Sequence, residues 1–115
     1  MSGGHQIDAA SGAVIVTLRG ELDAHDAPTL KELFGEALAA ASEGAAAPRV
    51  VLDLAAVGFL DSTVLGTIVG VLRRAREAGG DVKVVLPEGP ARRIFEITGL
   101  EKVVDIRPDR ASAIA

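Results

Sequence analysis

The sequence predicts an α/β fold in which a mostly parallel sheet of four to five strands is combined with about four helices. Short runs of aliphatic residues alternate along the chain with segments whose apolar residues recur every three or four positions. In addition, the run 49–54 has consecutive apolar residues on both faces, as expected of a central parallel strand covered on both sides. The chain of 115 residues is long enough for one core, so we expect a single domain over residues 1–115.

The first segments predict two strands. Residues 5–9 predict a short edge strand, which pairs back across a Ser11-Gly12 turn. The run 14–19 predicts a second strand, closed by Gly20.

A helix is expected after the polar loop Asp23–Asp26. Asp26 is expected to cap this helix, and Pro28 lies in its first turn. The buried face of the helix is predicted from apolar residues at helical spacing: Leu30, Leu33, Phe34, Ala37, Leu38 and Ala41. Gly44 to Pro48 is expected to be a linker that leads into the strand 49–54.

The motif Phe59-Leu60-Asp61-Ser62-Thr63-Val64-Leu65-Gly66 leads from that strand into a second helix. The apolar face of this helix is marked by Leu65, Ile68, Val69, Leu72 and Ala75, and Val64 and Val71 widen that face. The tripeptide 61–63 therefore lies at a helix N-terminus, where backbone N–H groups lack partners and the helix dipole favours negative charge. Gly66 and Gly70 each cost about 1 kcal/mol relative to alanine inside this helix, so we expect the sheet or a partner to pack closely there.

The last third of the chain predicts two further strands and two further helices. Gly79-Gly80 is expected to end the second helix, and the run 82–86 predicts a strand. Pro90 opens a third helix, the run 103–106 predicts a final short strand, and Pro108 to Ile114 predict a terminal turn of helix.

Composition excludes several classes of function. The chain has no cysteine, which excludes disulfides, thiol catalysis and thiolate metal sites. A net charge of −4 and only three aromatic residues, all Phe, argue against nucleic-acid binding. The basic cluster Arg73-Arg74-Ala75-Arg76 is interpreted as a solvated last helical turn that complements the dipole. No apolar segment is long enough to cross a membrane and no leader pattern opens the chain, so we expect a cytoplasmic protein without membrane contact.

Catalytic and metal sites are weakly supported. A Ser62–His25–Asp23 triad is conceivable, because both loops could lie at the same edge of an α/β sheet, but no Gly-x-Ser-x-Gly elbow surrounds the serine. Asp23, His25 and Asp26 could hold a metal, yet such residues are common in loops that start helices. Both nucleotide-binding glycine fingerprints are missing. We therefore expect no enzyme activity, no metal and no cofactor.

The tripeptide Asp61-Ser62-Thr63 has two interpretations. All three are capping residue types, so the simpler interpretation is a helix cap. One cap does not need all three residues, so a hydroxyl is left to face solvent. A phosphate on that hydroxyl would add a charge of about −1.5 to −2 at the positive end of the dipole, and it would repel a partner docked over the helix start.

With these motifs, the chain resembles the STAS domain family, and within it the single-domain bacterial anti-sigma-factor antagonists. The most specific part of the resemblance is the Asp-Ser-Thr motif before the second helix. The remaining similarity covers nearly the whole chain, at Gly20-Glu21-Leu22-Asp23, the helix 27–38, Asp53-Leu54, Leu65-Gly66, Gly79-Gly80 and the segment 93–100.

The resemblance implies a STAS-like β-α superhelix with Ser62 at the exposed start of the second helix. It implies that the unphosphorylated protein binds an anti-sigma factor that is also a serine/threonine kinase and thereby releases the sigma factor. The kinase then phosphorylates Ser62, binding ends, and a PP2C-type phosphatase resets the switch. Such switching serves transcription regulation in stress response or sporulation, and the free protein is expected to be a monomer.

The resemblance also implies a partner surface around Ser62. Asp23 is expected on the kinase-facing side, with Asp61, Thr63, Val64 and Gly66 beside the serine. Many members have glycine where this chain has Val64, and we expect the β-branched side chain to add bulk next to the phosphorylated residue. Thr63 is left open as a second site of phosphorylation.

A different class of function stays open beside this one. The chain could instead be a STAS scaffold or a ligand-sensing subunit of a larger complex, of the stressosome-like or transport-associated kind. Assembly into large oligomers would favour that alternative.

Overall fold

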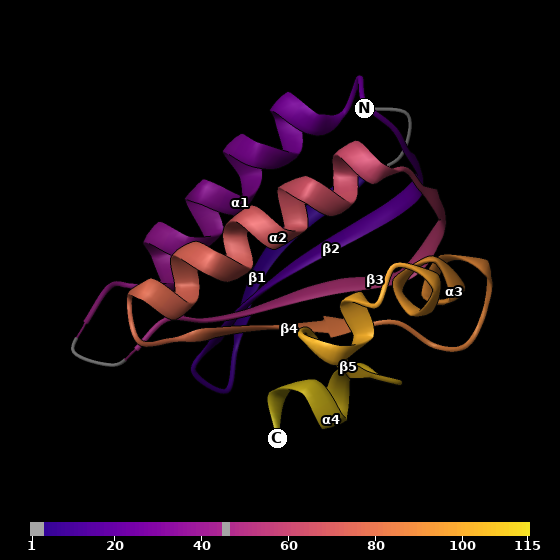
Figure 1. Cartoon of the computed structure of the whole chain (residues 1–115). Coiled ribbons are helices and arrows are strands. Elements are labelled where there is room, and N and C mark those ends of the chain that lie inside the picture. Colours follow the sequence, from indigo (N-terminus) through magenta and orange to yellow (C-terminus); the bar gives the residue numbers. More distant parts are fainter. Residues whose placement is uncertain (1–3, 45–46) are drawn as a thin grey trace.

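A five-stranded sheet with the strand order β1-β2-β3-β4-β5 organises the protein (Figure 1). The computed structural model describes residues 4–44 and 47–115, so residues 45 and 46 of the expected linker lie outside the described part. The first strand is antiparallel to the second, and the other neighbouring pairs are parallel. The strands are β1 (His5–Ala10), β2 (Ala13–Leu22), β3 (Arg49–Leu60), β4 (Asp81–Val85) and β5 (Asp105–Arg107).

The helices divide between the two faces of this sheet. Figure 1 shows α1 and α2 side by side over one face and α4 on the opposite side. The bounds are α1 (Ala27–Ala41), α2 (Ser62–Glu77), α3 (Pro90–Ile97) and α4 (Arg110–Ile114), with a 3₁₀ helix η1 at Leu100–Lys102. Among the described residues, none of these helices combines the length and the apolar character that a membrane crossing needs.

Most of the core lies between the sheet and the helices α1, α2 and α3. The side chains of Leu30 and Phe34 in α1 and of Ile68 in α2 are completely buried there. A smaller apolar cluster on the other face joins Ile15, Val51 and other strand residues to Ala113 of α4. The central strand β3 is therefore covered on both faces, as the consecutive apolar residues of its first half predicted.

Two strands are longer than predicted. The strand β2 continues through Gly20 to Leu22, although Gly20 was expected to close it. Gly20 instead adopts a positive φ of 90° beside a shift in the register between β2 and β3, a position that glycine occupies without strain. Because β2 continues, β3 also extends beyond the expected end at residue 54 and stays paired up to Leu22↔Leu60.

At the two edges of the sheet, the predicted first strand is confirmed, and the predicted bounds of the last strand are corrected. The predicted edge strand is present, and Ser11 and Gly12 form its turn with φ of 52° and 78°, as a two-residue hairpin with both positions left-handed requires. The final strand lies at 105–107, not at 103–106, because η1 and its cap at Val103 occupy the first of those residues.

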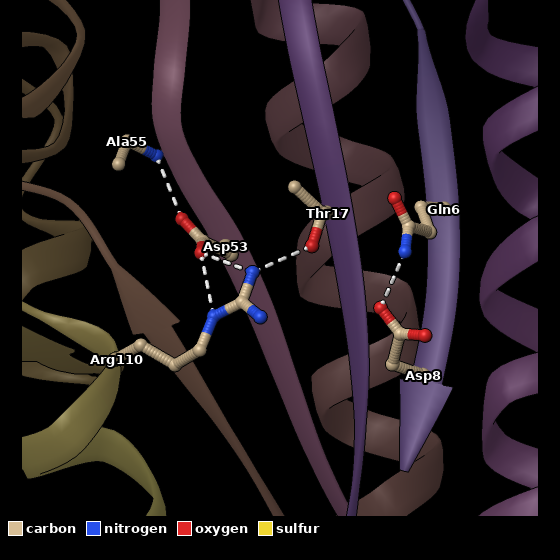
Figure 2. A network of polar contacts seen from close by, with 6 residues as sticks. All are labelled: Gln6, Asp8, Thr17, Asp53, Ala55 and Arg110. Carbon is tan, nitrogen blue, oxygen red and sulfur yellow. Dashed lines mark hydrogen bonds and ion pairs between the residues drawn. The ribbon is translucent and has the colours of Figure 1, made fainter. Parts of the chain in front are cut away.

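A polar pair fastens the C-terminal helix α4 to the sheet (Figure 2). The guanidinium of Arg110 donates from Nη2 and Nε to Oδ2 of Asp53 at 2.8 and 3.1 Å. It also donates to Oγ1 of Thr17 at 2.8 Å, while the other oxygen of Asp53 accepts from the N–H of Ala55 at 3.1 Å. Asp53 is buried, so this pairing compensates a carboxylate that has left water.

Candidate functional site

The functional candidate Ser62 is the first residue of α2, directly after the carboxyl end of β3. Asp61 is the N-cap, and its Oδ1 accepts from the N–H of Val64 at 3.0 Å. The carbonyl of Asp61 accepts the first helical hydrogen bond from Leu65 at 3.0 Å. The cap therefore belongs to Asp61 alone, and Ser62 is not needed for it.

The hydroxyl groups of Ser62 and Thr63 face outward. Both residues are exposed, and neither hydroxyl makes a hydrogen bond to any other part of the chain that the structure describes. They also lie in the first turn of a helix, where N–H groups have no helical partner and the dipole favours negative charge. A covalent anion on Ser62 would therefore meet no internal contact that it must break.

The loop 23–26 lies at the same edge of the sheet as Ser62. The register pairs Leu22 with Leu60, and the N–H of Asp61 donates to the carbonyl of Leu22 at 3.3 Å. The chain continues from these paired residues into the Asp23 loop on one side and into α2 on the other. Asp23 and Ser62 are thus both presented at the edge where the carboxyl ends of β2 and β3 meet.

Hydrogen bonds within this loop correct one expectation. Asp26 precedes α1, but its side chain makes no cap hydrogen bond to that helix. Its Oδ2 points back and accepts from the N–H of Asp23 at 2.9 Å, and Oδ1 of Asp23 accepts from the N–H of His25 at 2.9 Å. Asp26 is therefore buried as a brace for the loop, while the Asp23 side chain stays more than half exposed.

The structure does not assemble the triad or the metal site that were weighed from the sequence. The imidazole of His25 is 97% exposed and lies 3.6 Å from Oδ1 of Asp23, but no hydrogen bond joins it to Ser62 within the described residues. Across residues 4–44 and 47–115, no group of three or more His, Cys, Asp or Glu is arranged to hold a metal ion. The carboxylate of Asp26, which was considered as a metal ligand, instead accepts a hydrogen bond from the N–H of Asp23.

Val64 departs from the expected partner surface. Its side chain is completely buried in the core between the sheet and the helices. The extra bulk of a β-branched residue is therefore accommodated inside the domain, and the expectation that it adds bulk next to Ser62 is wrong. The physical reason is the helical register, which turns the third residue of α2 toward the same face as Leu65 and Ile68.

Gly66 and Gly70 lie on the outward side of α2, and the sheet does not pack against them. A Cβ placed on either residue would meet no atom within 4 Å. They line a surface groove with Thr63, Lys31 of α1, and Arg73 and Arg74 of α2. The sequence interpretation treated the arginines only as complements of the helix dipole and did not connect Lys31 with them, because spacing along one helix does not reveal a neighbour on another.

Comparisons with known proteins identify the family of this chain. The family model described as the STAS domain matches residues 5–113. The chain is 30% identical to the anti-sigma F factor antagonist of Paenibacillus polymyxa over 103 residues, covering 90% of this chain and 85% of that protein. It is 35% identical to the anti-sigma-B factor antagonist of Bacillus subtilis over 91 residues, covering 79% of this chain and 78% of that protein.

Solved structures show the same fold. A crystal structure of an anti-sigma factor antagonist from Mycobacterium paratuberculosis superposes with a TM-score of 0.85 at 28% identity, covering 98% of this chain and 92% of that one. The unphosphorylated form of SpoIIAA superposes with a TM-score of 0.65 at 18% identity, covering 95% of this chain and 92% of that one, a likeness of fold alone.

The structure combines a mixed sheet, helices on both faces and an exposed serine at the start of α2, and the curated relatives are named as anti-sigma factor antagonists, a class of regulatory proteins. The family match and the identity to curated relatives make the assignment specific. The chain belongs to the STAS domain family.

Proposed function

We propose that this protein is an anti-sigma factor antagonist controlled by phosphorylation of Ser62. In its unphosphorylated form it binds an anti-sigma factor that is also a serine/threonine kinase, and the sigma factor is released. Phosphorylation of Ser62 by that kinase ends the binding, and a PP2C-type phosphatase restores the first form. The partner surface comprises Asp23, Asp61, Thr63 and Gly66 around the serine.

One observation carries this proposal: the hydroxyl of Ser62 is exposed and unbonded at the start of α2, while Asp61 makes the helix cap. A kinase can therefore reach the hydroxyl without unfolding the helix. The names of the curated relatives support the assignment of an anti-sigma factor as partner.

Electrostatics explain why a phosphate at this position would act as an off-switch. The phosphate adds a charge of about −1.5 to −2, beside the carboxylate of Asp61 and at the same sheet edge as Asp23. The free protein tolerates this charge because it meets the positive end of the α2 dipole and water. A docked partner would remove that water and place its own charged and polar groups against the phosphate. The phosphate would therefore lower the stability of the complex and not that of the free protein.

The test is phosphate mapping with purified components. The protein is incubated with ATP and each candidate kinase-type anti-sigma factor of its genome, and modified peptides are identified by mass spectrometry. We expect a single phosphate on Ser62, which is lost in Ser62→Ala. Ser42→Ala is the matched control, because it removes an exposed serine hydroxyl at the C-terminal end of α1, outside the partner surface, and should leave phosphorylation of Ser62 intact.

Binding of two Ser62 variants completes the test. Ser62→Ala should bind the kinase and keep it bound in the presence of ATP, whereas Ser62→Asp should bind at least about tenfold more weakly, since it places a charge at the interface. Equal affinity of the two variants would contradict the proposed switch. Absence of phosphate with every candidate would favour a STAS scaffold or ligand-sensing subunit.

A further inference from the structure

A groove of about 460 Å³ runs along the outer side of α1 and α2, next to the Ser62 site. Thr63 lines it and directly follows Ser62, so the groove adjoins the serine. Arg73 and Arg74 line it from the fourth turn of α2, and Lys31 lines it from α1. With a rise of about 1.5 Å per residue, the distance along α2 from Thr63 to Arg74 is roughly 16 Å.

The groove concentrates positive charge that the fold does not use. Lys31, Arg73 and Arg74 are exposed, and none of their side chains makes a hydrogen bond or ion pair within the described residues. No Asp or Glu of the described residues lines the groove. The whole chain carries a net charge of −4, so this surface is opposite in sign to the protein that bears it.

Two glycines also leave the backbone of α2 accessible within the groove. Gly66 and Gly70 present bare backbone along α2, and added Cβ atoms would meet nothing within 4 Å. Internal packing therefore does not require glycine at either position, although each glycine lowers helix stability relative to alanine. A surface that another chain approaches closely would explain why small residues occupy both positions.

We propose that this groove binds an acidic segment of the anti-sigma factor kinase, an inference that rests on the function proposed above. The carboxylates of that segment pair with Lys31, Arg73 and Arg74, and its backbone lies against Gly66 and Gly70. A groove of roughly 16 Å holds about five residues of extended chain, at about 3.3 Å per residue. Arginine is suited to this contact because its guanidinium pairs with a carboxylate through two hydrogen bonds.

The groove also links the acidic segment to the serine. A segment that begins beside Thr63 has its first carboxylate close to the position of the Ser62 side chain. A phosphate on Ser62 would then repel the segment in addition to blocking the helix start. Complementary charge holds the unphosphorylated complex together, and the same charge pattern makes the phosphorylated complex unfavourable.

The first experiment measures the dissociation constant of the unphosphorylated protein with the kinase that phosphorylates Ser62 in the mapping assay. The triple variant Lys31→Glu/Arg73→Glu/Arg74→Glu should bind about tenfold more weakly or worse, because like charges would then face each other. Its affinity should also depend less steeply on salt than that of the wild type. The control is Arg93→Glu on α3, an exposed arginine without a described partner, which should bind within about twofold of the wild type.

The second experiment uses Gly66→Ala/Gly70→Ala, for which stability and affinity should change in opposite directions. The double variant should melt several degrees higher, because alanine favours the helix and the space is open. Its affinity for the kinase should fall at least about fivefold if the segment lies against the helix backbone. The proposal requires both losses of affinity, and wild-type affinity in either variant would overturn it.

The results of these experiments distinguish failure of the groove proposal from failure of the proposed phosphorylation switch. If the kinase phosphorylates Ser62 but binds the triple variant normally, the switch stands and the groove proposal is overturned. If no kinase binds, the switch fails, and a synthetic hexaglutamate peptide tests the groove by amide NMR shifts at Gly66 and Gly70. Shifts that are absent in the triple variant would support the groove, whereas no shifts, or larger shifts with a single-stranded oligonucleotide, would overturn it.

Discussion

At the start of α2, the helix cap and the proposed phosphorylation site are different residues. Asp61 satisfies the N–H of Val64, whereas the neighbouring hydroxyl of Ser62 stays free. A cap lost from Asp61 would weaken the helix itself, while a change at Ser62 would alter only the surface. This division allows the serine to be modified without a penalty for the fold.

The division predicts unequal effects of two adjacent substitutions. Asp61→Ala should lower the free energy of unfolding by about 1 kcal/mol, because the N–H of Val64 loses its acceptor. Ser62→Ala should stay within about 0.5 kcal/mol of the wild type, as expected of a surface position. Urea unfolding followed by circular dichroism measures both values. Asp61→Asn, which retains a capping oxygen, should recover most of the loss, and an equal loss in Ser62→Ala would contradict the division.

The short helix α4 is joined to the sheet by both an apolar and a polar contact. It contributes Ala113 to the apolar cluster on the second face of the sheet and carries Arg110, which neutralises Asp53 of the central strand. The pair joins residues that lie 57 positions apart in the chain. A helix of only five residues gains its stability from these contacts, since it is too short to be stable alone.

Removal of this pairing should be costly. Arg110→Ala should lower the free energy of unfolding by about 1–3 kcal/mol, because the Asp53 carboxylate stays buried after its cation is lost. Adding Asp53→Asn to Arg110→Ala should recover part of that loss, since an amide is less costly to bury than an unpaired charge. Chemical denaturation gives these values. The exposed residue Arg93 provides the control as Arg93→Ala, and an equal loss there would show that any arginine has this effect.

Most elements could be predicted because their signals are local. Periodicity, glycine and proline located the helices and the sheet, and the motif at 61–63 located the helix start. Pairing between distant segments could not be predicted in this way. The extension of β3 to Leu60 depends on the continuation of the neighbouring strand β2. The pairing of Asp53 with Arg110 depends on how α4 packs against the sheet.

The site shows the same limit of local reasoning. Asp26 and Asp61 both precede a helix, and only the geometry of each turn decides which of them accepts a helical N–H. The helical pattern correctly places Val64 on the apolar face of α2, and only the expectation drawn from glycine-bearing family members, that its side chain adds bulk next to Ser62, is wrong. The groove needed the side-by-side placement of α1 and α2, which brings Lys31 to the arginines.

Over the whole molecule, charge is distributed unevenly. The net charge is −4 and the isoelectric point is about 5.1, yet the groove between α1 and α2 is lined by cations without acidic residues among those described. At the far edge of the sheet, Nε of Arg107 donates to Oδ1 of Asp105 at 2.8 Å. This hydrogen bond holds the pKa of Asp105 below its ordinary value, with the charges of Arg107 and Lys83 acting in the same direction.

The lowered pKa predicts how stability depends on pH. A carboxylate whose pKa is lower in the folded state stabilises the fold above its unfolded pKa of about 3.9, and that contribution is lost as the pH falls through the lower folded value. The free energy of unfolding should therefore decrease as the pH falls below about 4. Asp105→Asn should be less stable than the wild type at neutral pH, and the difference should shrink in acid. Urea titrations from neutral pH to pH 3 measure it, and a difference independent of pH would contradict the assignment.

The isolation of the Ser62 hydroxyl has a consequence for how long a signal lasts. Because this side chain has no bond to any described neighbour, a phosphate added there breaks no internal contact, and the positive end of the α2 dipole favours the added charge only modestly. In the proposed switch, neither form would convert to the other spontaneously, because uncatalysed hydrolysis of a phosphate monoester is extremely slow. The duration of the response would then be set by the rates at which the kinase adds the phosphate and the phosphatase removes it.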